Sequence, residues 1–251
     1  DFGTSYSRKA AVSATIWQRL KVSLLFSLFS ILLAYNLSLP IAAYAALHPN
    51  SIFDRFSAGI LFFMYALPSF FVASLLLLTF SNPSVFSWLP SSGISPLNPL
   101  SDATFFENFM VQLPYLLLPF VCYTYAMLAF IGRSMRSVFI DNLPLDYIRT
   151  ARAKGLSEAN IILGHVLKNA LVPLITIFSN VFPYAIGGAV IIESIFSLPG
   201  MGLEIVHAIK SQDYPVLVAV FTLAGFLTLT VNLLCDFLCA LVDPRITFSR
   251  Q

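Results

Sequence analysis

Charged residues are scarce in this chain, and long stretches have none. Of its 251 residues, 10% are Asp, Glu, Lys or Arg and 58% are hydrophobic. This composition excludes an ordinary soluble domain, in which about 25% of residues are charged. The formal net charge is only +2, and the basic residues form no stripe with stacking aromatics. We therefore expect no nucleic-acid partner.

Residues that bind metals or carry out catalysis are also few. Cys122, Cys235 and Cys239 lie in apolar stretches without a Cys-x-x-Cys pair, which predicts buried thiols and no disulfide. The 3 histidines are scattered between loops, so we expect no metal site and no cofactor. No Gly-x-x-x-x-Gly-Lys-Ser/Thr, His-Glu-x-x-His or Gly-x-Ser-x-Gly motif occurs. The chain is therefore predicted not to be an enzyme and not to hydrolyse ATP.

The uncharged stretches are long enough to cross a lipid bilayer, because about 20 apolar residues in a helix span its hydrocarbon core. We expect an all-α membrane protein, a polytopic helical bundle with five spans in this chain. Their expected ranges are Val22–Leu47, Ala58–Phe80, Met110–Ile131, Ala170–Ile192 and Pro215–Leu241. Prolines should kink or end these helices. They are Pro68, Pro114, Pro119, Pro173 and Pro183.

The loops predict the orientation of the spans. The segment from Gly132 to Lys168 holds six arginines and lysines, which places it in the cytoplasm. The loop at 81–109 has none and the loop at 194–214 has only Lys210, so both are expected outside. The C-terminal tail would then lie inside, and residues 1–21 would form an external segment that leads into the first span.

This orientation conflicts with the positive charge near the start of the chain. The tendency of basic loops to stay in the cytoplasm would keep this segment in the cytosol, because it contains Arg8, Lys9, Arg19 and Lys21. The chain begins with Asp and has no signal peptide. We interpret it as a fragment whose upstream part holds at least one further span, which makes six in the whole protein.

The most informative stretch is polar and lies between two expected spans, at 146–173. It predicts a short helix, a break at Gly155 and a second short helix. Pro144 suits the first turn of the first helix, and Gly155 suits a left-handed stop. Ser157 can cap the next helix, with Glu158 in its first turn. The alternative is a solvated loop whose cations only fix the orientation.

This stretch resembles the cytoplasmic "EAA" loop of importer-type ABC transporter permeases, in the branch that carries peptides and nickel. Three further stretches agree with that branch: AGILFFMYALPSFF, ESIFSLPGMGLEIVHAIKSQDYPVL and DFLCALVDPRI, at 58–71, 193–217 and 236–246. The resemblance covers nearly the whole chain in the same order. Three departures occur. Arg149-Thr150-Ala151 stands where the general pattern has Glu-Ala-Ala, His165-Val166-Leu167-Lys168 where it has Ile-x-Leu-Pro, and Gln212 where the branch often has arginine.

The resemblance implies a fold, a function and partners. The fold is that of type I ABC importer permeases, with a transmembrane permease domain at 22–251 and a cytoplasmic coupling loop at about 132–169. The function is ATP-driven import of short peptides, or a related small solute, across the bacterial inner membrane by alternating access. A second homologous permease, two ATP-binding cassette ATPases and a periplasmic binding protein would be its partners. Residues expected to couple to the ATPase are Asp146, Arg149, Thr150, Ala151, Arg152, Ala153, Lys154, Gly155, Ser157 and Glu158.

Four polar residues in or beside the spans are weaker candidates for a path or gate. They are Asn180, Glu193, Asn232 and Asp236. Placement at a span end explains the two carboxylates, and bonding between helices explains the two amides. An ion-coupled secondary transporter and a non-transporting membrane scaffold are the alternative functions. A secondary transporter needs an ionisable residue deep in a span or an inverted repeat. A scaffold does not need two short cytoplasmic helices joined at a glycine.

Overall fold

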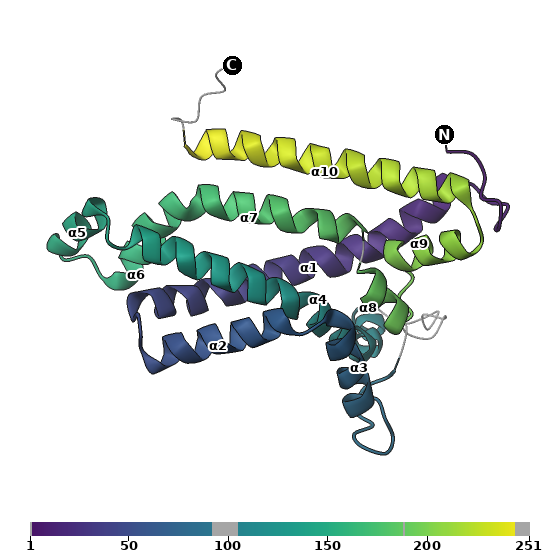
Figure 1. Cartoon of the computed structure of the whole chain (residues 1–251), viewed down its shortest axis with the longest axis horizontal. Helices are drawn as coiled ribbons and strands as arrows, with labels where there is room; N and C mark the ends of the chain where they lie inside the picture. Colours follow the sequence, from purple (N-terminus) through teal and green to yellow (C-terminus); the bar gives the residue numbers. More distant parts are fainter. Residues whose placement is uncertain (1, 92–104, 188, 244–251) are drawn as a thin grey trace. The chain divides into compact units, whose positions relative to one another are not determined.

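The computed structural model describes residues 2–91, 105–187 and 189–243, and most of them are helical (Figure 1). The expected all-α class is confirmed. The helices in chain order are α1 Val12–Leu47, α2 Ile52–Ala66, α3 Ser69–Phe80, α4 Phe105–Asn142, α5 Asp146–Ala153, α6 Glu158–Ile161, the π-helical turn η1 Ile162–Val166, α7 Leu167–Gly187, α8 Val190–Ile195, α9 Met201–Lys210 and α10 Tyr214–Val242.

The helices long and apolar enough to cross a membrane agree with the expected multi-pass protein. Within the described residues there are 4 such helices, and up to 5 when a bent pair is taken as one span. The four are Val12–Leu47, Met110–Asn142, Glu158–Pro183 and Tyr214–Val242. The bent pair is α2 and α3, which meet at an angle of 97°.

Several expected spans have different bounds in the structure. The helix expected from Val22 starts at Val12, and the helix expected to end at Ile131 continues to Asn142. The span expected at 58–80 is broken at Leu67 and Pro68 into α2 and α3, as expected for a proline that kinks or ends a span. Proline has no N–H to donate and disfavours a helical conformation at the residue before it. The span expected at 170–192 is displaced toward the N-terminus, since α7 runs from Leu167 to Gly187 and the separate α8 starts at Val190. The helices α4 and α7 continue through their own prolines.

The chain packs as two compact units. The first unit comprises residues 1–30, 67–126 and 183–227, and the second comprises 31–66, 127–182 and 228–251. In the first unit Phe26 of α1 packs against Cys122 and Tyr123 of α4 and against Phe196 and Leu198 after α8. This apolar core supports the polar groups described below. The cysteines at 122 and 235 are buried as expected, whereas Cys239 is half-buried.

The second unit joins α2 tightly to α4. A Cβ at Gly132 would lie 3.1 Å from Leu61 Cδ1, so the glycine allows a close approach of the two helices. Arg136 donates from Nε and Nη2 to the two carboxylate oxygens of Asp54, at 2.6 and 2.8 Å. Such two-point pairs fix the orientation as well as the distance of their partners. Further along the chain, the fully buried Ile148 anchors α5 to this unit.

Candidate functional site

Residues 146–161 lie between α4 and α7 in the chain and form a short helix pair, α5 and α6, which we name the ledge (Figure 1). The predicted order of helix, glycine break and helix is confirmed. The predicted start at Pro144 is wrong, because Leu145 occupies the N-cap position of α5. The helix α4 extends to Asn142, and the N–H of Leu145 donates to the carbonyl of Asn142 at 3.2 Å. This turn occupies residues 142–145, so α5 begins after it.

Gly155 ends α5 in the left-handed conformation, with φ of +77°. The N–H of Gly155 donates to the carbonyl of Arg152 at 2.9 Å, and the N–H of Leu156 donates to that of Ala151 at 3.3 Å. These two bonds form a Schellman motif, which satisfies carbonyls at the helix end. No atom lies within 4 Å of a Cβ built at Gly155. The position therefore needs glycine for its backbone and not for space.

The second ledge helix is capped and tied to the first. Ser157 Oγ accepts a hydrogen bond from the N–H of Asn160 at 3.3 Å. Arg152 donates from Nε and Nη2 to the carboxylate of Glu158, at 2.8 and 3.1 Å, across the glycine joint. The hydrogen bond to Glu158 raises the pKa of Arg152 above its ordinary value. This pair holds the two short helices at a defined angle.

The ledge has one buried side and one exposed side. Ile148 and Ala151 are buried against the rest of the second unit, so Ala151 does not lie on the surface where it was expected. Ala151 is buried because it lies on the same inward face of α5 as Ile148, three residues earlier. The exposed ledge residues are Asp146, Arg149, Thr150, Arg152, Ala153, Lys154, Gly155, Leu156, Ser157, Glu158, Ala159 and Asn160. They form a mainly polar surface with small residues at its centre.

A π-helical turn, Ile162–Val166, connects α6 to α7 without a loop. Leu167 is its C-cap residue, and the N–H of Leu167 donates to the carbonyl of Ile162. The chain is therefore helical without interruption from Glu158 to Gly187. Such turns are rare and frequently occur at functional sites. The sequence patterns did not indicate it.

The candidates for a path or gate lie in different surroundings. Asn180 and Asp236 are exposed. Asn232 on α10 accepts a hydrogen bond at its Oδ1 from Ser179 Oγ on α7, at 2.8 Å. This contact agrees with bonding between helices. In the part of the chain that the structure describes, no three His, Cys, Asp or Glu side chains gather as a metal site.

Glu193 is buried, with 1% of its surface exposed, and does not extend to an interface as a residue at a span end would. Its Oε1 accepts hydrogen bonds from Ser23 Oγ at 2.7 Å and from Tyr123 OH at 2.9 Å. Its Oε2 accepts one from the N–H of Leu203 at 2.9 Å. A Cβ at Gly200 would overlap the carboxylate, so the Leu-Pro-Gly-Met-Gly turn closes directly over this charge.

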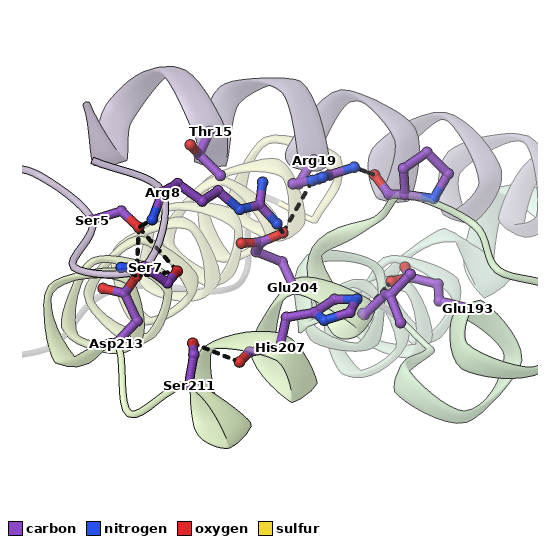
Figure 2. A network of polar contacts seen from close by, with 12 residues as sticks. Ser5, Ser7, Arg8, Thr15, Arg19, Glu193, Glu204, His207, Ser211 and Asp213 are labelled. Carbon is purple, nitrogen blue, oxygen red and sulfur yellow. Dashed lines mark hydrogen bonds and ion pairs between the residues drawn. The ribbon is translucent and has the colours of Figure 1, made fainter. Parts of the chain in front are cut away.

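A second network joins the start of the chain to the segment around α9, and we name it the N-terminal clasp (Figure 2). Arg8 donates to Glu204 Oε2 at 2.7 Å, and Arg19 donates to the same oxygen at 3.1 Å. Figure 2 shows the two guanidinium groups converging on Glu204 from the N-terminal segment and from α1. The side chain of Glu204 is only 4% exposed, so its charge depends on these two partners.

Asp213 forms the other part of the clasp. It accepts hydrogen bonds from the hydroxyls of Ser5 and Ser7 and from the N–H groups of Tyr6 and Ser7. Burial opposes the charge of Asp213, but these hydrogen bonds outweigh burial and lower its pKa to about 2. Residues 5–19 therefore lie on the same side of the first unit as the 194–214 loop. Which side of a membrane they face stays a prediction.

Comparison with known proteins identifies the family. The model of the binding-protein-dependent transport system inner membrane component matches residues 38–248. The chain belongs to this family. The oligopeptide transport system permease protein AppB of Bacillus subtilis (strain 168) is 39% identical over 249 residues, which cover 99% of this chain and 76% of AppB. The peptidoglycan transport system permease protein YejB of Agrobacterium fabrum is 32% identical over 252 residues, 100% of this chain and 69% of YejB.

A solved structure supports the fold. The inward-facing MetNI methionine ABC transporter superposes with a TM-score of 0.64, covers 92% of this chain and 97% of its own, and is 15% identical. The protein is thus a membrane-embedded permease subunit of an ATP-driven importer. The permease is not itself an enzyme, because ATP hydrolysis belongs to a separate subunit in this family. The secondary-transporter and scaffold alternatives are wrong.

The permease holds functional groups that sequence reasoning missed. The sequence patterns do not indicate Ser23 and Tyr123 as partners of Glu193, or Glu204 and Asp213 as buried hydrogen-bond acceptors. Their partners lie more than 65 residues away in the chain, with Tyr123 70 residues from Glu193. One signal was present, since positive residues in an expected external segment require acidic partners in another external loop. Glu204 is such a partner.

Proposed function

We propose that the permease imports short peptides across the inner membrane of a bacterium. The names of two relatives support this substrate class, because one transports oligopeptides and the other peptidoglycan, which contains peptide chains. The spans are nearly free of charge, which suits a path that takes peptides of varied sequence. The family requires a binding protein that delivers the substrate and an ATPase that drives transport.

The proposed assembly contains a second homologous permease subunit, two ATPase subunits and one periplasmic binding protein. The ledge and the C-terminus lie in the cytoplasm, and residues 1–21 lie in the periplasm. Four of the six basic residues in 132–168 follow the end of α4 and support this orientation; they are Arg149, Arg152, Lys154 and Lys168. The N-terminal clasp supports it further, since Arg8 and Arg19 have a buried acidic partner and need no anionic membrane surface.

The ledge is the proposed docking site for the ATPase. The observation that carries this proposal is a rigid polar surface made by the Gly155 joint and the Arg152–Glu158 pair. Arg149 and Lys154 are exposed beside it and can pair with acidic groups of the partner. A helix of this size buries too little area to bind tightly alone, so the contact can form and change during each ATP cycle.

Movement of the ledge would reach the spans by two routes. The helical run from Glu158 to Gly187 continues the second ledge helix into α7, and a three-residue turn connects α4 to the first. Closure of the ATPases would therefore move α4 and α7 together with the ledge. Rigid-body rocking of such elements exposes a central path to one side and then to the other.

Substitutions at Gly155 test this proposal in the complete transporter. We expect Gly155→Pro to reduce ATPase retention and peptide uptake at least about tenfold, because proline cannot adopt a positive φ. Gly155→Asn should retain both, since asparagine tolerates the left-handed region. The control is Gly164→Ala, which adds a methyl group where no atom lies within 4 Å. Each variant would be purified from membranes with its partners, and the amount inserted would be measured.

Two results would contradict the docking role. Normal ATP-driven uptake by Gly155→Pro would show that the joint is not needed. Loss of the ATPase from Gly164→Ala as well as from Gly155→Pro would show that any change in this segment disrupts the complex.

A further inference from the structure

Two neighbouring arginines on α4 extend in opposite directions along α2. Arg136 binds Asp54, near the start of α2. Arg133 lies over the rings of Phe62 and Tyr65, with its guanidinium carbon 5.7 and 5.2 Å from their centroids. Residues 54 and 65 are about 16 Å apart along a helix that rises about 1.5 Å per residue. The two charges are therefore far apart although their backbones are one turn apart.

The position of Arg133 is unusual for a membrane protein. Phe62 and Tyr65 lie about 15 and 20 Å from the start of α2, in a segment that pairs with α3 as a candidate span. Arg133 itself lies inside the helical segment Met110–Asn142, which is long and apolar enough to cross a membrane. Long basic side chains usually extend to the nearer interface. Arg133 instead lies over two aromatic rings, and an arginine within a span faces a water-filled cavity or the interior of a bundle.

A cavity of about 310 Å³ adjoins this guanidinium. Tyr65, Phe130, Arg133 and Ser134 line it. Within the described residues Arg133 makes no hydrogen bond or ion pair, and its charge is held by the two aromatic rings. A ring attracts the cation through its face and uses none of the five N–H donors. The donors remain available to a ligand in the cavity.

We propose that this cavity is a station on the translocation path, where Arg133 binds the terminal carboxylate of the passing peptide. This inference rests on the proposed function of peptide import. Every peptide with a free C-terminus carries this carboxylate whatever its sequence, and the guanidinium fork matches a carboxylate with two parallel hydrogen bonds. The aromatic walls accept varied apolar side chains without selecting one. The cavity volume is within the range of small-molecule sites, about 300–1,000 Å³.

Because Arg133 is exposed, it would bind a passing carboxylate weakly and would not retain it. A charge pair in contact with water is weak, because solvent screens the attraction. Transport requires binding strong enough for entry and weak enough for release, as in ion pathways. The phosphate of an anionic lipid has similar chemistry and could also bind a guanidinium, so the test separates these two sources.

The experiment uses the complete transporter in phosphatidylethanolamine vesicles with and without phosphatidylglycerol. ATP-driven uptake of trialanine is compared with uptake of its C-terminal amide, for wild type, Arg133→Gln and Arg133→Lys. The same binding protein is present throughout, so its own preference cancels when the acid-to-amide ratio of a variant is divided by that of wild type. Arg55→Gln is the matched control, since it removes another exposed guanidinium from the α2 side.

We expect Arg133→Gln to lower the acid-to-amide ratio about fivefold, the upper end of the effect of an exposed charge pair. Arg133→Lys should lower it about threefold, because lysine keeps the charge and loses the fork. Arg55→Gln should leave the ratio unchanged. An unchanged ratio in Arg133→Gln, with uptake still active, overturns the inference and leaves peptide import intact.

The remaining outcomes also decide the question. Equal loss of acid and amide uptake in Arg133→Gln overturns the inference. If wild-type uptake then depends on phosphatidylglycerol and the variant's does not, a lipid phosphate occupies the cavity. A wild-type transporter that takes up neither form contradicts the proposed substrate class, and the inference with it.

Discussion

The ledge and the N-terminal clasp both pair arginine with glutamate, but they do so under opposite conditions. In the ledge, Arg152 and Glu158 are 6 residues apart and are 43% and 50% exposed. In the clasp, Arg8 and Glu204 are 196 residues apart, and Glu204 is 4% exposed. The ledge pair fixes a local shape at a surface that a partner can reach. The clasp pair joins distant segments around a charge that water does not reach.

This difference has an energetic consequence. An exposed pair contributes about 0.2–1 kcal/mol, whereas removal of one partner from a buried pair costs about 3–5 kcal/mol. Changes in the ledge should therefore affect coupling more than folding. Changes in the clasp, and at the neighbouring Glu193, should affect the stability of the first unit. The predictions below test this division.

The largest effect is expected at Glu193. Glu193→Ala leaves the hydroxyls of Ser23 and Tyr123 and the N–H of Leu203 without their acceptor. Since each unpaired buried donor costs about 1–3 kcal/mol, we expect a loss of at least about 3 kcal/mol in unfolding free energy. Tyr123→Phe removes one of these bonds and should cost about 1 kcal/mol. Denaturant unfolding in detergent measures both, and equal losses would contradict the shared role of the carboxylate.

A matched pair of substitutions compares the two regions directly. Glu204→Gln removes the charge that Arg8 and Arg19 share, and we expect a loss of about 2–4 kcal/mol in unfolding free energy. Glu158→Gln removes the charge of the ledge pair and should cost less than about 1 kcal/mol. By contrast, Glu158→Gln should reduce ATPase retention more than Glu204→Gln does, because only Glu158 lies on the proposed docking surface. If Glu158→Gln proves as destabilising as Glu204→Gln, the comparison fails.

The same difference in sequence separation explains what the sequence could predict. The ledge depends on contacts within a few residues, so Gly155 and Ser157 indicated the break and the cap directly. The spans followed from the spacing of charges, and Pro68 indicated the break between α2 and α3. The partners of Glu193 and Glu204 come from distant helices, and no local pattern specifies which helices meet. Burial also could not be read locally, which is why Ala151 was placed on the wrong side of the ledge.

A smaller effect concerns pH and distinguishes the clasp again. Hydrogen bonds lower the pKa of Asp213 to about 2 from an ordinary value of 3.8. A lowered carboxyl pKa stabilises the folded state above the ordinary value, and this contribution is lost as pH falls toward 2. We expect the melting temperature of wild type to fall more steeply than that of Asp213→Asn between about pH 4 and pH 2.5. Parallel curves for the two proteins would show that Asp213 is not the group responsible.

The smallest effect is expected at the cap of the second ledge helix, where a local contact has a local result. Ser157→Ala removes the bond to the N–H of Asn160, and loss of such a cap costs about 0.5–2 kcal/mol. The long-range core of the protein is untouched, so we expect faster hydrogen exchange near Asn160 with an unchanged melting temperature. The control is Thr150→Ala, whose hydroxyl bonds only to the carbonyl of Asp146 in its own helix, at 2.9 Å. Faster hydrogen exchange beyond the ledge, in α7, would mean that the cap also stabilises the span. The ledge would then depend on long-range contacts, as the clasp does.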